Sequence, residues 1–140
     1  MHINQAFCSF MLTGIFLDLV VSFILKSLVK RERPRVNQMD MFFTVSVDKF
    51  SFPSGHATRA GLVAVFFYVH FNYSHKFVLA IIAWTLLVCL SRILLGRHYV
   101  SDVLAGYVIG MLEYKLLECL WLSEDSCRSI IRLIEEDFHL

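Results

Sequence analysis

The chain has 140 residues, is 57% hydrophobic and 18% charged, and carries a formal net charge of +1 at pH 7. Soluble domains are usually about 45–50% apolar and about 25% charged, so this composition is unusual for a chain that folds in water. The near-zero net charge gives no whole-molecule attraction to nucleic acid. The four cysteines show no metal-ligand spacing. We therefore expect no nucleic-acid partner, no metal and no cofactor.

Apolar residues are gathered into four runs: Phe7–Leu25, His56–Phe71, Phe77–Leu95 and Val100–Leu122. About 20 residues of helix span a bilayer core, and about 17 can suffice. We predict an all-α, multi-pass membrane bundle of four transmembrane helices. A buried four-helix bundle in water is the alternative, but Phe77–Leu90 lacks the polar stripe that such a helix would show.

The first predicted helix covers about Phe7–Val29 and leads into a basic cluster of Lys26, Lys30, Arg31, Arg33 and Arg35. We expect Pro34 to end this helix. Such a cluster either snorkels to the membrane interface and contacts anionic lipid, or forms part of an anion site.

The second helix is expected to begin at the tetrapeptide Pro53-Ser54-Gly55-His56, where the polar loop Val36–Phe52 ends. Ser54 is a good N-cap residue, and Gly55 lets a ligand approach the backbone closely. The first turn of a helix offers unpaired N–H groups and a positive dipole end, which favour anions. His56 adds a titratable imidazole at this point.

Short turns separate the remaining predicted helices, which cover about His56–Phe71, Phe77–Leu95 and a segment that begins near Ser101 as N-cap. Gly106 and Gly110 form a small-xxx-small pattern that allows close helix packing. We divide the chain into a membrane-embedded domain, residues 1–122, and an amphipathic tail helix, residues 123–140.

Alternating crossings of the membrane predict that the unusual polar residues meet on one face. The end of the first helix, the start of the second, the end of the third and the start of the fourth all lie on that face. Its cations are Lys26, Arg33, Arg92 and Arg97. Arginine binds phosphate bidentately and lysine acts as a point charge, so this face predicts a phosphate site.

Two histidines supply the chemistry expected at this site. Asp102 lies four residues after His98, so we expect it to accept a hydrogen bond from one ring nitrogen and leave the other free to attack. His56 would protonate the leaving oxygen. A nucleophilic histidine, an acidic histidine and a cationic cradle together indicate phosphoryl transfer without a metal.

Three motifs carry a family resemblance: Lys26-x6-Arg33-Pro34, then Pro53-Ser54-Gly55-His56, then Ser91-Arg92-x5-His98-x3-Asp102. Their order and spacing resemble the signature of the phosphatidic acid phosphatase type 2 superfamily. The resemblance implies that His98 is the nucleophile, Asp102 its partner and His56 the general acid. It also implies a set of phosphate-binding residues: Lys26, Arg33, Ser54, Gly55 and Arg92.

A narrower resemblance, to the polyisoprenoid diphosphate or presqualene diphosphate phosphatases, rests on Asn37–Met41 and Val47–Arg59. It implies farnesyl, geranylgeranyl or presqualene diphosphate as substrates, and residence in the endoplasmic reticulum and nuclear envelope. Integral members of the superfamily usually have six membrane helices, so the four predicted helices would lack the family's first two.

Three functions remain open at this point. The first is a membrane lipid phosphatase, alone or in a homo- or hetero-oligomer, that acts on a phosphorylated lipid. The second is a catalytically impaired, truncated homologue that acts as a partner or regulator of full-length phosphatases. The third, a vanadate site like that of the soluble haloperoxidases, fits less well because this chain is so apolar.

Overall fold

The computed structural model describes residues 2–34, 49–70 and 74–120, which form four helices. Their bounds are α1 His2–Val29, α2 Gly55–His70, α3 His75–Leu94 and α4 Val100–Leu120. The predicted all-α architecture is therefore confirmed. Residues 36–48 of the polar loop and the predicted tail helix lie outside the described residues.

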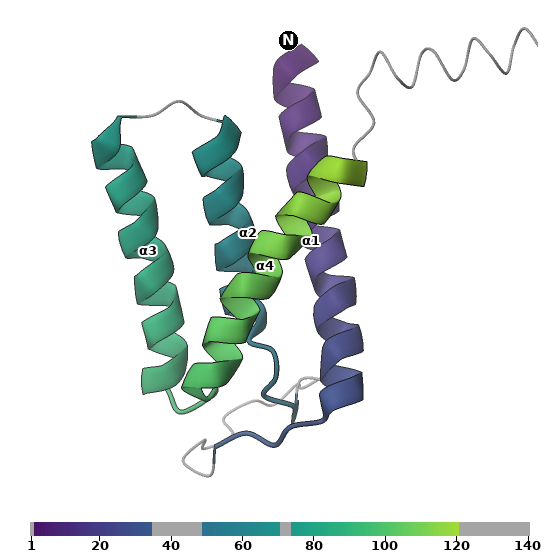
Figure 1. Ribbon diagram of the computed structural model, residues 1–140, viewed down its shortest axis with the longest axis vertical. Helices are drawn as coiled ribbons and strands as arrows, with labels where there is room; N and C mark the ends of the chain where they lie inside the picture. Colours follow the sequence, from purple (N-terminus) through teal and green to yellow (C-terminus); the bar gives the residue numbers. More distant parts are fainter. Residues whose placement is uncertain (1, 35–48, 71–73, 121–140) are drawn as a thin grey trace, which may run out of the picture.

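Consecutive helices run in opposite directions, and α2 lies at the centre of the bundle (Figure 1). It packs against α1 and α3, and most extensively against α4. The C-terminal ends of α1 and α3 consequently lie at the same end of the molecule as the N-terminal ends of α2 and α4. This is the convergence that alternating crossings predicted, and we call it the cavity end.

Glycines permit the close packing of α4 on α2. A Cβ atom placed on Gly106 would lie 2.8 Å from the carbonyl oxygen of Ser54, and one on Gly110 would overlap the carbonyl of Thr58. Backbones that approach this closely leave no room for a side chain. The packing predicted from the small-xxx-small pattern is confirmed, and it fixes the start of α4 against the start of α2.

Within the described residues, two helices are long and apolar enough to cross a membrane, namely α1 over Phe7–Val29 and α3 over His75–Leu94. Of the α3 side chains, only that of Thr85 is buried, and its leucines are exposed, as expected of a surface in contact with lipid. Helix α2 is shorter, with 16 residues, and α4 carries Asp102, Glu113, Lys115 and Glu118.

Aromatic side chains fill the opposite end of the bundle, which we call the aromatic end. The ring of Phe66 lies 5.7 Å from that of Phe10 and 4.8 Å from that of His70. The hydroxyl of Tyr114 lies 3.1 Å from Nε2 of His70. Phe10, Phe66 and Tyr114 form the buried apolar core together with Leu62 and Leu117.

Two helix ends lie within one residue of their predicted positions, but the residues that form these ends differ from the prediction. Helix α1 ends at Val29, before Pro34, because Lys30 adopts the left-handed conformation with φ 49° and its N–H still donates to the carbonyl of Lys26 at 3.0 Å. Helix α4 begins at Val100, so Ser101 lies within its first turn and Tyr99 precedes the helix.

Candidate active site

A polar cavity of about 280 Å³ lies at the cavity end. Residues from all three predicted motifs line it, and they come from all four helices or the segments that flank them. The lining residues are Lys26, Arg33, Gly55, His56, Arg59, Arg92, Arg97 and His98. Cations and two imidazoles therefore face one space at the end of an apolar bundle. Such a space favours an anion with several negative charges.

The segment after α1 and the segment before α2 are tied together, which places Arg33 beside the start of α2. The N–H of Ser51 donates to the carbonyl of Arg31 at 2.8 Å, and its hydroxyl donates to the carbonyl of Glu32 at 3.1 Å. Lys26 lies in the last turn of α1 and is only 9% exposed. Its ammonium group is thus directed at the cavity from within the bundle.

The tetrapeptide turns the chain into α2 as predicted, but its serine caps the helix through the backbone. The carbonyl of Ser54 accepts from the N–H groups of Ala57 and Thr58 at 2.9 and 3.0 Å. Its Oγ is buried, without a hydrogen-bond partner among the described residues. The Ser54 N–H donates to the carbonyl of Asp102 at 3.2 Å, which links the starts of α2 and α4.

His98 is 6% exposed, and its Nδ1 lies 2.7 Å from the carbonyl oxygen of Ser51. A carbonyl only accepts, so Nδ1 carries the hydrogen and Nε2 keeps its lone pair. The pKa of the imidazole is lowered from 6.5 to about 4, chiefly by burial and also by the charges of Arg33 and Lys26. The hydrogen bond to Ser51 and the charge of Asp102 act in the opposite direction. The ring is therefore neutral and nucleophilic at neutral pH.

We expected Asp102 to orient the ring of His98 through a hydrogen bond. The carbonyl of Ser51 orients the ring instead. Asp102 is fully buried and accepts from Arg31 at 2.7 Å and from the N–H of Tyr99 at 3.0 Å. A carboxylate that reaches back to the N–H preceding its helix is half of a capping box. Asp102 thus fixes the turn that carries His98.

The structure brings most of the predicted site residues to the cavity. His56, His98, Lys26, Arg33, Gly55 and Arg92 line it, whereas Ser54 and Asp102 are buried behind its wall. Arg97, noted in the sequence but given no role, also lines the cavity. Arg59 was missed, although a charge just inside an apolar run was a usable signal.

Arg31 is a second residue that sequence reasoning left without a role. Its guanidinium donates to Asp102, donates to the hydroxyl of Ser101 at 2.8 Å and lies 4.2 Å from the ring centroid of Tyr99. Arg31 is one of the five residues of the basic cluster, and nothing in the sequence distinguished it from the other four. Across the described ranges, His, Cys, Asp and Glu side chains form no group of three that could hold a metal, and the metal-free site stays a prediction.

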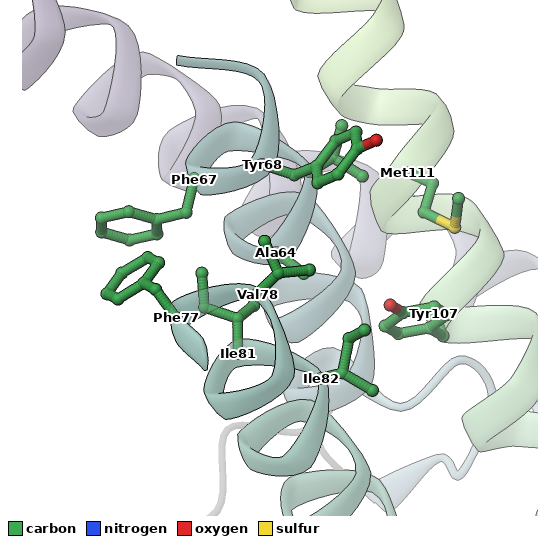
Figure 2. A pocket seen from close by; sticks show the side chains of 10 residues that line it. Ala64, Phe67, Tyr68, Phe77, Val78, Ile81, Ile82, Tyr107 and Met111 are labelled. Atoms are coloured by element: carbon green, nitrogen blue, oxygen red, sulfur yellow. The ribbon is translucent and has the colours of Figure 1, made fainter. Parts of the chain in front are cut away.

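A separate pocket of about 230 Å³ lies between α2, α3 and α4 and is almost entirely apolar. Figure 2 shows Phe67 and Phe77 on one side of it and Tyr107 and Met111 of α4 on the other. None of its lining residues carries a charge, so the chemistry of the site belongs to the polar cavity.

Comparison with known proteins supports the same interpretation. Residues 7–119 match the PAP2 superfamily. The chain belongs to the PAP2 superfamily. It is 36% identical to the probable lipid phosphate phosphatase beta of Arabidopsis thaliana over 73% of this chain, and 36% identical to phosphatidylglycerophosphatase B of Bacillus subtilis over 72%. The chain spans only 60% and 51% of these two PAP2 relatives.

Two solved structures resemble this PAP2 chain. The crystal structure of the transmembrane PAP2-type phosphatidylglycerolphosphate phosphatase from Bacillus subtilis aligns with a TM-score of 0.58 and 31% identity, and covers 77% of this chain and 55% of the other. Aquifex aeolicus LpxE aligns with a TM-score of 0.63 over 81% of this chain and 67% of the other. At 22% identity, the second likeness shows the fold alone.

Proposed function

We propose that this PAP2 protein is a membrane lipid phosphatase that releases phosphate from a phosphorylated lipid through a phosphohistidine intermediate. The observation that carries the proposal is the cavity itself, where cations and two histidines converge at one end of an apolar bundle. Relatives named as lipid phosphate and phosphatidylglycerophosphate phosphatases support it.

The phosphate group would bind among the cationic side chains of the cavity. Lys26 supplies a point charge, whereas Arg33 and Arg92 supply planar pairs of donors that match phosphate oxygens. Gly55 lines the cavity at the first turn of α2, where the absence of a side chain lets a phosphate oxygen approach the positive end of the helix dipole. A phosphate carries nearly two negative charges at neutral pH, which this set of cations balances.

In the proposed reaction, Nε2 of His98 attacks the terminal phosphorus, and the bond between that phosphorus and its bridging oxygen breaks. His56 donates a proton to the departing oxygen, which leaves as a lipid alcohol or a lipid monophosphate. Water then attacks the phosphohistidine, gives its proton to His56 and releases inorganic phosphate, which restores both histidines. The cations stabilise the charge that spreads over the transferring group.

Asp102 acts in this proposal as a positioning residue. Its carboxylate holds the N–H of Tyr99 and the guanidinium of Arg31, and so it keeps the turn between α3 and α4 in place. The tautomer of His98 is set by the Ser51 carbonyl.

We extend the proposal to polyisoprenoid diphosphates as substrates, and to the endoplasmic reticulum and nuclear envelope as the location. The residues that support this are those around the tetrapeptide, Val47–Arg59, which resemble that branch. An isoprenoid diphosphate has the required shape, with its head at the interface and its tail among the helices.

The test is phosphate release by the purified full chain in detergent, with chelator present, from farnesyl diphosphate, phosphatidic acid and phosphatidylglycerophosphate. We expect His98→Ala to lower turnover at least about a thousandfold. Lys115→Gln is the matched control, because Lys115 is 63% exposed, pairs with its neighbour Glu118 along α4 and does not line the polar cavity. Equal turnover in the His98→Ala variant would overturn the mechanism.

The same assay addresses the partner role that the sequence left open. A chain that releases no phosphate alone, yet co-purifies with a longer homologue and alters its turnover, would replace the proposal with a regulatory one. Preference for phosphatidic acid over farnesyl diphosphate would keep the phosphatase and overturn the isoprenoid assignment.

A further inference from the structure

Three charged side chains meet inside the bundle, below the cavity. Asp18 of α1 is completely buried, Glu113 of α4 is 4% exposed, and Arg59 of α2 is ion-paired with Asp18. Charged residues inside membrane helices are costly and usually mark a functional pathway or site. None of the three belongs to the signature motifs, so the proposed mechanism leaves them unexplained.

Arg59 connects this buried group to the cavity. Its Nε lies 2.7 Å from Oδ2 of Asp18, and its side chain lines the cavity beside Gly55. A Cβ atom on Gly55 would lie 3.3 Å from Nη2 of Arg59, so the guanidinium lies against the first turn of α2. With Nε–H donating to Asp18, the two Nη groups form the end of the guanidinium that faces away from that bond.

Glu113 closes the group from the side of α4. Its carboxyl lies within electrostatic reach of Asp18 and Arg59. Oδ1 of Asp18 and both oxygens of Glu113 are buried and have no hydrogen-bond partner within the described ranges. The ion pair with Asp18 is therefore the contact that holds the Arg59 guanidinium in place.

We propose that Arg59 is an additional phosphate-binding residue of the cavity, and that Asp18 is its positioning residue. Asp18 holds the planar guanidinium in one orientation before the anion arrives, so that less side-chain freedom is lost when phosphate binds. The inference deepens the proposed function, since it concerns the same site, but its test requires only binding.

The experiment measures binding of inorganic phosphate to the purified full chain in detergent, in the absence of any lipid substrate. We expect Arg59→Gln to weaken binding at least about tenfold, as the loss of one charge-assisted contact would. Lys115→Gln is the control and should leave the affinity unchanged. An affinity of Arg59→Gln within twofold of wild type would overturn the proposal.

A double-mutant cycle tests Asp18 separately from Arg59. Asp18→Asn should weaken phosphate binding at least threefold in the wild-type background and less than twofold in the Arg59→Gln background, because Asp18 acts only through Arg59. Equal effects of Asp18→Asn in both backgrounds would overturn its positioning role.

One further variant keeps the test decisive if Arg59→Gln does not fold. Arg59→Lys keeps the charge beside Asp18 but loses the planar fork, so we expect an unchanged melting temperature and at least threefold weaker phosphate binding. Unchanged affinity in a folded Arg59→Lys protein would also overturn the proposal.

Failure of this inference and failure of the proposed function give different results. Phosphate binding that depends on Arg59, without release of phosphate from any lipid, would keep the anion site and reject the phosphatase. Turnover that depends on His98, together with phosphate binding that is unchanged in Arg59→Gln, would keep the phosphatase and reject the role of Arg59.

Discussion

The cavity end and the aromatic end of the bundle are built from opposite kinds of side chain. At the cavity end, hydrogen bonds and ion pairs such as Arg31–Asp102 hold the helix starts together around a polar space. At the aromatic end, rings such as those of Phe10 and Phe66 pack directly against one another in an apolar core. The same four helices are thus joined by electrostatics at one end and by packing at the other.

This difference separates stability from chemistry along the length of the bundle. The cations that line the cavity repel one another, so the cavity end contributes less to folding than its polar contacts suggest. The aromatic end has no such conflict. Substitutions at the aromatic end should therefore mainly lower stability, whereas substitutions at the cavity end should mainly lower turnover.

The largest expected effect is on stability, from Phe66→Ala. Phe66 is 3% exposed and contacts rings from α1 and α2. Its removal leaves a cavity, and we expect a loss of about 2–4 kcal/mol in the free energy of unfolding in detergent. Phe16→Ala is the matched control, because Phe16 is 69% exposed on α1. Turnover of folded Phe66→Ala protein should match wild type, and a large drop in kcat would contradict the separation of the two ends.

Arg33→Gln should give the reverse pattern. Loss of one charge-assisted contact to phosphate costs about 1.5–3 kcal/mol, which is about 10- to 150-fold in kcat/KM. We expect little change in melting temperature, because the remaining cations gain from reduced repulsion. Lys30→Gln is the control in steady-state assays, because Lys30 belongs to the same basic cluster and is exposed. Equal losses in the two variants would mean that the cluster acts only through its overall charge.

Arg31→Gln should affect both measurements, since Arg31 holds Asp102 rather than substrate. Asp102 is fully buried, while Arg31 is 39% exposed, so solvent screening reduces the cost to about 1–2 kcal/mol of stability. Turnover should fall about tenfold through displacement of the turn before α4, an effect on kcat more than on KM. Arg31→Lys should recover the stability but only part of kcat. A pure KM effect would instead place Arg31 in contact with substrate.

The sequence predicted the cavity end better than the buried group beneath it, for a physical reason. Residues at helix ends are placed by counting crossings, so Arg33, Arg92 and His98 could be brought together without knowing how any helix is rotated. The pairing of Asp18 with Arg59, 41 positions apart, depends on the rotation and tilt of two helices, which apolar runs do not reveal.

Backbone partners escaped prediction for a related reason. The carbonyl of Ser51 that orients His98 has no side-chain signature, so the neighbouring Asp102 was the natural candidate. The helix end at Lys30 depends on a left-handed residue, whereas Pro34 offered a more visible stop signal. The four helices themselves were predictable because their apolar runs are long and are separated by short polar segments.

The smallest expected effect concerns the protonation of His98 near neutral pH. Burial, with Arg33 and Lys26, lowers its pKa to about 4, so the imidazole should stay neutral as the pH falls from 7 to 5. The reactive lone pair is lost only as the pH falls through about 4.

The unfolded chain, with an ordinary histidine pKa, binds the proton first. Protonation of His98 therefore favours unfolding, and stability should decline as the pH falls from about 6.5 towards 4. Histidine ¹⁵N chemical shifts, assigned by their loss in His98→Gln, would follow this titration directly. Arg33→Gln should raise the midpoint, because it removes a repelling charge. A midpoint near 6.5 in the wild-type protein would mean that the ring of His98 is solvated. Burial and the neighbouring cations of the cavity end would then have no effect on the nucleophile.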